Sequence, residues 1–268
     1  MPSREVDKSP EKIRRMFGSI APRYDFLNRL LSLRLDVSWR RRCADRLLKA
    51  TTVDGPILDV CTGTADLALA LWKRQQTRKV FGVDFSPEMI DIGKKKTRST
   101  DIELSVGDAL NLPFDDESFA AVCVAFGLRN ISDTDRGLAE MVRVCKPGGV
   151  VAVLEFSMPT LPILSGFYRF YFRTVLPRIG QCLAKNRDDA YTYLPESVLQ
   201  FDNPQHLADR MRAAGLVDIE IRSLTFGTVT LLTGRRNRSV LCRPEVGSYQ
   251  TPQESSKLTE PECPLSTE

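Results

Sequence analysis

The stretch "ILDVCTGTAD" at residues 57–66 decides how the rest of the chain is interpreted. A short apolar strand with an acid at Asp59, a tight turn and a following helix are typical of a nucleotide-binding strand–turn–helix corner. Only Gly63 stands where such a turn usually carries two or three glycines. Taken alone, the stretch is as compatible with a structural turn that binds nothing as with a cofactor site.

Strand and helix patterns alternate after this corner. The sequence predicts strands at 57–60, 79–84, 102–107, 119–125 and 149–156, and helices at 66–74, 87–97 and 134–145. The strands at 119–125 and 149–156 are almost continuously apolar, as strands covered on both faces are. This alternation indicates an α/β protein with a mostly parallel, doubly wound sheet and helices on both faces.

The pattern changes toward the C-terminus. A helix predicted at 204–214 is followed by two strands, at 217–224 and 227–234, with a short turn between them. Strands so close in sequence must pair antiparallel, because a parallel crossover needs a dozen or more residues. A doubly wound sheet that ends in an antiparallel hairpin is the arrangement of the class I S-adenosylmethionine-dependent methyltransferase fold.

The two ends of the chain differ in composition from its centre. Residues 1–10 and 245–268 are polar and are predicted to be disordered. Residues 11–50 are predicted to form an N-terminal helical lid, and 51–240 the methyltransferase domain. A chain of 268 residues, 42% hydrophobic and 27% charged, suits one large domain with such appendages.

Charge and cysteine content exclude several classes of protein. The net charge of +4 is too small to indicate nucleic-acid binding, although it suits transient contact with an anionic membrane surface. The seven cysteines show neither a disulfide framework nor a metal-ligand spacing. The sequence shows no signal peptide and no apolar run near the ~18 residues that span a bilayer. We therefore expect a cytoplasmic protein, at most peripheral on the inner face of the membrane.

Three consecutive strand ends carry groups that suit an adenosine. Gly63 lets the backbone approach a ligand, and Thr64 adds a hydroxyl and an amide. Asp84 ends the second strand, where an acid can accept hydrogen bonds from both ribose hydroxyls. Asp108 and the amide of Ala109 can bind the adenine amino group and a ring nitrogen. Each residue alone has an ordinary turn interpretation, but the three strand ends together favour a cofactor.

The missing glycines indicate which cofactor it is. A pyrophosphate needs the full G-x-G-x-x-G cradle, whereas S-adenosylmethionine has no phosphate and tolerates a less open turn. The sequence therefore predicts S-adenosylmethionine as the methyl donor and no metal. A dinucleotide oxidoreductase is the least suitable alternative.

Several longer stretches resemble the UbiE/MenG family of demethylmenaquinone and ubiquinone-precursor C-methyltransferases. They are "MFGSIAPRYDFLNRLLSLRLDVSWRR" (16–41), "ILDVCTGTADLALAL" (57–71), "PFDDESFAAVCVAFGLRNISD" (113–133), "RVCKPGGVVAVLEFSMP" (143–159) and "YTYLPESVLQF" (191–201). The "SIAPRYDFLN", "FGLRN" and "YLPESV" segments make the resemblance family-specific, and it covers roughly residues 11–236.

The resemblance implies which residues contact the methyl donor: Thr64, Asp84, Asp108 and Ala109. Ala125, just before the "FGLRN" loop, is a further donor-binding candidate, although relatives often carry a serine there and alanine lacks that hydroxyl. Cys61 and Ala65 stand where relatives often have smaller residues or glycine.

Methylation of a quinol carbon needs a neighbouring hydroxyl that loses its proton, and hence a general base or a cation that favours the phenolate. Arg129 is the foremost candidate, because it follows the fourth strand at the cofactor edge; the alternative is a salt bridge to a nearby acid. Asp25 is the second candidate, with lid packing as the alternative. Tyr24 and Asn130 are candidates for substrate binding. His206, the only histidine, is expected on the surface.

An aromatic stripe occurs in residues 164–176, "LSGFYRFYFRTVL", with arginines beside it. Core packing is the ordinary explanation, and a membrane interface that collects a prenylated quinol is the alternative. We predict C-methylation of a prenylated quinol, foremost of demethylmenaquinol to menaquinol. The alternatives are the benzoquinol precursor of ubiquinone, another hydrophobic phenol, or a cofactor-binding protein without catalysis.

Overall fold

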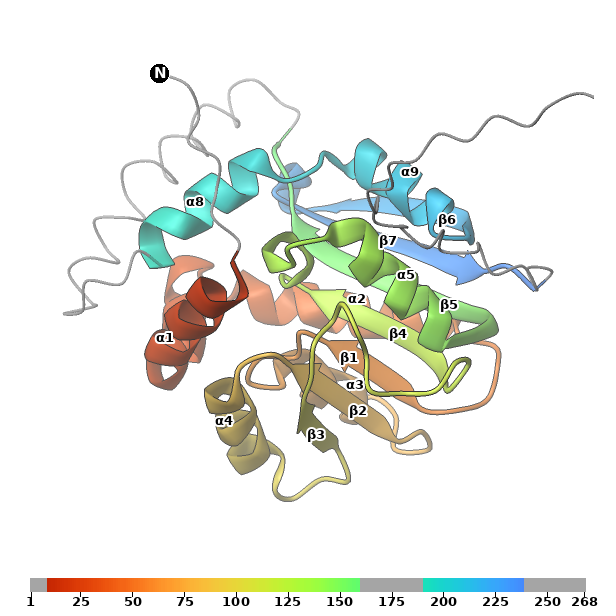
Figure 1. Cartoon of the computed structure of the whole chain (residues 1–268), viewed down its shortest axis with the longest axis horizontal. Coiled ribbons are helices and arrows are strands. Elements are labelled where there is room, and N and C mark those ends of the chain that lie inside the picture. Colours follow the sequence, from red (N-terminus) through yellow and green to blue (C-terminus); the bar gives the residue numbers. More distant parts are fainter. Residues whose placement is uncertain (1–8, 160–189, 239–268) are drawn as a thin grey trace, which may run out of the picture.

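The computed structural model describes residues 9–159 and 190–238 (Figure 1). Its elements in chain order are α1 (Pro10–Leu31), α2 (Leu35–Ala50), β1 (Ile57–Val60), α3 (Asp66–Trp72), β2 (Val80–Asp84), α4 (Pro87–Thr97), β3 (Glu103–Val106), β4 (Phe119–Ala125), η1 (Leu128–Asn130), α5 (Thr134–Val144), β5 (Cys145–Phe156), α8 (Ala190–Gln200), α9 (Pro204–Ala213), β6 (Leu216–Leu224), η3 (Thr225–Gly227) and β7 (Val229–Arg236).

The described strands form one seven-stranded sheet in the order β3-β2-β1-β4-β5-β7-β6. Strands β1 to β5 pair parallel, and β7 is antiparallel to both of its neighbours, β5 and β6. The order reverses between β1 and β4, and at such a point the carboxyl ends of the strands leave a crevice for a ligand. The predicted doubly wound sheet with a terminal antiparallel hairpin is confirmed.

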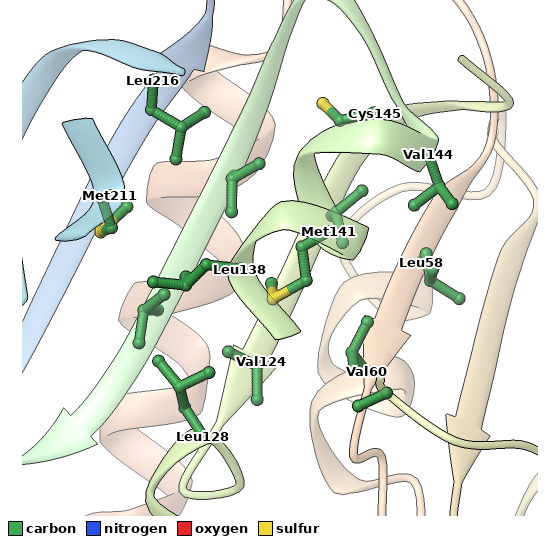
Figure 2. Close-up of a cluster of buried hydrophobic side chains, with 14 of the residues drawn as sticks. Leu58, Val60, Val124, Leu128, Leu138, Met141, Val144, Cys145, Met211 and Leu216 are labelled. Atoms are coloured by element: carbon green, nitrogen blue, oxygen red, sulfur yellow. The ribbon is translucent and has the colours of Figure 1, made fainter. Parts of the chain in front are cut away.

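Helices cover both faces of the sheet. In Figure 1, α5 and α9 lie in front of the sheet, whereas α2 and α3 lie behind it. The front core packs Leu138, Met141 and Met211 of the helices against Leu58 and Val124 of the strands (Figure 2). Burying one such leucine or methionine contributes roughly 1.5–3 kcal/mol. These contacts hold β1 and β4 side by side, and their carboxyl ends form the centre of the site.

Two helices precede the sheet. α2 packs on its rear face through a stripe of small and apolar residues that includes Trp39, Cys43 and Leu47. α1 instead lies beside α4 and α8, at the edge of the sheet where the parallel strands end (Figure 1). Met16 of α1 packs against Tyr193 of α8. Of these two helices, α1 therefore forms a wall at the carboxyl edge, whereas α2 belongs to the layer behind the sheet.

Two strand boundaries differ from the sequence-based prediction. β5 begins at Cys145 rather than at 149, because Cys145 already pairs with Phe119 before a register shift in the β4–β5 ladder. β7 begins at Val229 rather than at 227, because residues 225–227 form a turn with left-handed backbone at Phe226 (φ 56°) and Gly227 (φ 87°). The turn closes with a hydrogen bond from the Thr228 amide to the Thr225 carbonyl, and pairing of β7 with β5 starts only at Val229.

Some predictions fall on residues that the structure does not describe. The aromatic stripe at 164–176 and the tail at 245–268 lie outside the described residues, as do residues 1–8 of the N-terminal segment. Among the helices that are described, none combines the length and the apolar character needed to cross a membrane.

Candidate functional site

The turn after β1 is organised by the buried acid Asp59. This side chain is 1% exposed, and one carboxylate oxygen accepts hydrogen bonds from the Thr62 hydroxyl (2.7 Å) and the Ala68 amide (3.1 Å). The acid thus binds the turn and the first turn of α3 to the end of the strand. Its role is to shape the turn, since both donors belong to the protein itself.

The turn takes left-handed backbone conformations with only one glycine. Cys61 (φ 53°), Gly63 (φ 57°) and Ala65 (φ 67°) all have positive φ. Side chains at such positions cost roughly 1–2 kcal/mol each, and glycine avoids that cost. The turn therefore follows the path of a glycine-rich loop although two glycines are absent. Gly127 accommodates Cys61, because a Cβ at 127 would collide with the Cβ of Cys61.

Asp84 at the end of β2 contacts the same turn. Its two carboxylate oxygens accept hydrogen bonds from the Gly63 amide (2.8 Å) and the Ser86 amide (2.9 Å). Burial raises the pKa of the Asp84 carboxyl above its usual value, and the backbone donors offset this only in part. Each oxygen keeps a second lone pair, so the carboxylate can still accept hydrogen bonds from a diol.

Asp108 and Ala109 follow β3 at the neighbouring strand end. One oxygen of Asp108 accepts a hydrogen bond from the Leu110 amide (2.9 Å), which fixes the carboxylate at the start of the loop. Gly107 is needed just before it, because a Cβ there would lie 2.6 Å from Cγ2 of Val83. The loop therefore returns close over β2.

A pocket of about 870 Å³, including the space at its open mouth, lies at the carboxyl ends of β1, β2 and β4. Its position at the carboxyl ends of parallel strands is where ligands bind in open α/β sheets. Apolar side chains of α1, among them Ile13 and Phe17, form one wall. Seven of the predicted site residues line the pocket: Tyr24, Gly63, Asp84, Asp108, Ala109, Ala125 and Asn130.

Thr64 and Asp25 lie beside the pocket and not among the residues that line it. The Thr64 hydroxyl donates to Asp25 (2.5 Å), and the Lys96 ammonium donates to Asp25 (2.6 Å), to Thr64 (3.0 Å) and to Asp66 (2.6 Å). These contacts join α1 to the β1–α3 turn and to α4. They support the packing alternative for Asp25, because its carboxylate is committed to a cation and a hydroxyl.

Arg129 is buried in η1 and is not among the residues lining the pocket. Its guanidinium donates to Glu155 (2.8 Å) and to the Phe126 carbonyl, and its backbone amide donates to the other oxygen of Glu155 (3.3 Å). The ion-pair alternative is therefore present in the structure. The Arg129 Nε hydrogen has no hydrogen-bond partner in the part of the chain that is described.

The two substrate-binding candidates, Tyr24 and Asn130, both line the pocket. The Asn130 side-chain oxygen accepts a hydrogen bond from the Tyr193 hydroxyl of α8 (3.1 Å). Tyr24 approaches the turn so closely that a Cβ on Gly63 would lie 4.0 Å from its ring. Burial raises the pKa of the Tyr24 phenol, while Arg40 lowers it to a smaller extent. Tyr24 is therefore protonated at neutral pH and can donate a hydrogen bond.

His206 is not among the residues that line the pocket. Its side chain is 60% exposed in the first turn of α9, where Nδ1 contacts Asp202 (2.7 Å). Because no pocket residue depends on it, His206→Ala is expected to leave methyl transfer within about twofold of wild type and stability within ~0.5 kcal/mol. Steady-state turnover checks this, and loss of turnover in a folded variant would show that α9 takes part in catalysis.

The buried Asp59 gives a pH-dependent expectation. Burial raises its pKa to about 7, and the hydrogen bonds from Thr62 and Ala68 offset this only partly. In the unfolded chain an aspartate titrates near ~3.9. Between about pH 4 and pH 7 the folded protein therefore binds more protons at this residue, and its free energy of unfolding falls as pH rises.

Asp59→Asn is expected to remove the part of the decrease in unfolding free energy with pH that Asp59 causes. The variant should gain stability relative to wild type as pH rises from about 5 to about 7.5. Urea denaturation at the two pH values measures the difference. A stability difference that stays constant with pH would show that Asp59 titrates normally.

Sequence reasoning missed several residues that shape the site. Glu155 is a lone acid in an otherwise apolar strand, and that pattern was a usable signal for a buried ion pair. Tyr193 lies inside the "YLPESV" segment but had no assigned role. Lys96 had no local signal, since its partner Asp25 is 71 residues away. Among the described residues no group of His, Cys, Asp or Glu is arranged to hold a metal ion.

Solved structures share this arrangement. A SAM-dependent methyltransferase of Thermotoga maritima matches with a TM-score of 0.59 at 18% identity, over 83% of this chain and 99% of that one. The carbon methyltransferase CurJ matches with a TM-score of 0.56 at 11% identity, over 74% of this chain and 54% of that one. At such identities the likeness concerns the fold, which is that of the class I methyltransferases.

Sequence comparison gives the family. The model of the ubiE/COQ5 methyltransferase family matches residues 5–236. The chain is 45% identical to a ubiquinone/menaquinone biosynthesis C-methyltransferase UbiE of Citrifermentans bemidjiense, over 86% of this chain and 99% of the relative. It is 46% identical to a demethylmenaquinone methyltransferase of Deinococcus radiodurans, over 84% of this chain and 92% of the relative. The chain belongs to the ubiE/COQ5 methyltransferase family.

Proposed function

We propose that this protein transfers the methyl group of S-adenosylmethionine to a ring carbon of a prenylated quinol, foremost of demethylmenaquinol to give menaquinol. The observation that carries the proposal is the pocket at the carboxyl ends of β1, β2 and β4. It joins acids suited to an adenosine, Asp84 and Asp108, with the polar and aromatic groups Tyr24 and Asn130. The names of the relatives from C. bemidjiense and D. radiodurans support the same acceptor class.

The donor side of the pocket fits S-adenosylmethionine. Asp84 would bind the ribose hydroxyls, and Asp108 with the Ala109 amide would bind the adenine. Gly63 would let the backbone approach the donor closely, and Ala125 contributes a small side chain at the end of β4. When bound, the donor supplies a methyl group made electrophilic by its sulfonium. We assign Thr64 an indirect role, because its hydroxyl is directed to Asp25 and holds the turn in place.

The acceptor side supplies orientation and charge. Tyr24 and Asn130 would hydrogen-bond the quinol oxygens, since the Tyr24 phenol stays protonated and Asn130 is oriented by Tyr193. Arg129 would lower the cost of ionising the quinol hydroxyl through its field in a site of low polarity. The ion pair with Glu155 reduces that field but also holds the guanidinium still. We assign Asp25 to the docking of α1 rather than to proton transfer.

Apolar residues make the pocket suitable for a prenylated ring. Ile13 and Phe17 of α1 and Phe126 after β4 line it together with Phe85 and Ile131. These side chains exclude water from an ionised quinol, which would otherwise be stabilised by solvent and made less nucleophilic. The benzoquinol precursor of ubiquinone is the second acceptor, favoured by the relatives whose names include ubiquinone.

The test is methyl transfer with purified protein. Labelled S-adenosylmethionine is incubated with a short-chain demethylmenaquinol or with the short-chain benzoquinol precursor, each kept reduced. We expect label in the extracted naphthoquinol, and His206→Ala serves as the matched active control. Binding of the donor by calorimetry without transfer to either acceptor would instead indicate a cofactor-binding protein without catalysis.

A further inference from the structure

The corner between α1 and α2 exposes a group of large apolar side chains. Phe26 is 61% exposed, Leu30 43%, Leu33 81% and Leu35 39%; these four residues are named here the apolar corner. Phe26 and Leu30 lie one turn apart on α1, and Leu33 follows just after the helix ends at Leu31. Single exposed leucines are ordinary, whereas a contiguous group of this kind marks an interaction site.

The backbone of the corner is strained in a way that keeps Leu33 outside. α1 ends with hydrogen bonds from the Leu33 amide to Leu30 and from the Arg34 amide to Arg29 (2.7 Å). Leu33 (φ 51°) and Arg34 (φ 64°) have the left-handed conformation that glycine usually takes at such a helix end. A leucine in this conformation costs conformational free energy, and its 81% exposed side chain gains little packing in return.

The charge of this stretch is mainly positive. Between residues 22 and 46 the exposed charged side chains are four arginines, Arg23, Arg34, Arg41 and Arg42, and one acid, Asp45, which pairs with Arg74. The other two acids are less exposed and are held in ion pairs, Asp25 with Lys96 (2.6 Å) and Asp36 with Arg40 (2.7 Å). The corner is thus an apolar group bordered by positive charge.

A second exposed apolar tip lies at the same edge of the sheet. Phe226 is 75% exposed and has left-handed backbone (φ 56°) in η3. The neighbouring Thr225 accepts a hydrogen bond from the Trp39 indole of α2 (2.7 Å). β7 starts opposite Phe156, where β5 ends, so η3 lies at the carboxyl edge. The pocket, the N-terminal end of α2 and Phe226 therefore share one edge.

We propose that the apolar corner and Phe226 dock this protein on an anionic lipid bilayer. Leucine and phenylalanine side chains insert at the boundary between headgroups and acyl chains, while the arginines bind lipid phosphates. A second copy of the chain fits the surface less well, because a symmetric contact would bring the arginine border against itself. The proposal rests on the proposed function in one respect: a prenylated quinol resides in the bilayer, and this face directs the pocket edge toward it.

The test is sedimentation with vesicles of equal parts phosphatidylglycerol and phosphatidylcholine. Wild type is expected to bind at low salt and to dissociate as salt rises. Leu33→Asp/Phe226→Asp should weaken binding at least about tenfold, and Arg41→Glu/Arg42→Glu should weaken it about fivefold for each arginine lost. Lys73→Glu/Arg98→Glu makes the same change in net charge after α3 and α4, away from the corner, and should bind almost as wild type.

The outcomes separate this inference from the proposed function. All variants should keep wild-type melting temperatures and wild-type methyl transfer to a short-chain quinol without lipid. The docking surface would be overturned if Leu33→Asp/Phe226→Asp bound vesicles as wild type does. It would also be overturned if the Arg41/Arg42 and Lys73/Arg98 double variants lost vesicle affinity equally. A change of oligomeric state, measured by light scattering, in place of a change in lipid binding would overturn it as well. If the wild-type protein transfers no methyl group to the short-chain quinol, the proposed function is rejected and the docking surface is not.

Discussion

Replacing Arg129 with methionine is expected to abolish most methyl transfer and to lower the free energy of unfolding by about 3–5 kcal/mol. The stability loss follows because Glu155 is 2% exposed and pairs with Arg129 at 2.8 Å, so the substitution leaves a buried carboxylate without its cation. The loss of transfer follows from the proposed role of Arg129, because the quinol hydroxyl would ionise without the field of its guanidinium. Thermal or urea unfolding and single-turnover kinetics measure the two effects.

A double variant separates these effects. Arg129→Met/Glu155→Gln removes both charges and keeps an oxygen that can accept from the Phe156 amide (3.0 Å), so it should regain most of the lost stability. Its methyl transfer should stay low while donor affinity stays close to wild type, because the proposed donor contacts belong to other strand ends. Wild-type turnover in this folded variant would show that Arg129 only holds β5 and η1 together.

Asp84→Ala is expected to weaken binding of S-adenosylmethionine by roughly 2–4 kcal/mol, about 30-fold to 900-fold. The substitution removes two proposed ribose hydrogen bonds. It also frees the Gly63 and Ser86 amides, which now donate to the carboxylate at 2.8 and 2.9 Å. Isothermal calorimetry measures the affinity, and circular dichroism confirms that the variant is folded.

Asp84→Asn is the matched control for that variant. The amide keeps one acceptor oxygen and nearly the same shape, so its loss of affinity should be smaller than that of Asp84→Ala. Wild-type donor affinity in a folded Asp84→Ala protein would contradict the assignment of this strand end to the adenosine. The pocket would then have to bind its ligand through other residues.

The strand ends were predictable because they follow from the alternation of strands and helices. In a parallel sheet the carboxyl ends of the strands meet at one edge, so Asp84 and Asp108 had to lie near Gly63. All three line the same pocket. The antiparallel hairpin was predictable for a similar reason, since its turn is too short for a crossover. Local sequence is sufficient for these features because each depends only on the direction and spacing of strands.

The orientations of other side chains depend on distant partners and were not predictable. Arg129 was placed at the correct edge, but its ion pair with Glu155 requires the pairing of β4 with β5. Thr64 is directed away from the pocket by Asp25, which comes from α1. Turn residues such as Phe226 shifted β7 by two positions, because their left-handed backbone has no clear pattern in sequence.

The position of the transferred methyl group tests the central claim most directly. Wild-type protein is supplied with S-adenosylmethionine carrying a carbon-13 methyl group and with a reduced short-chain demethylmenaquinol, and the product is analysed by carbon-13 NMR. The proposed site activates a ring carbon next to an ionised hydroxyl, so the label should appear as a methyl bonded to the quinone ring. Label found as a methoxy group, or no labelled quinone from a protein that binds the donor, would contradict it.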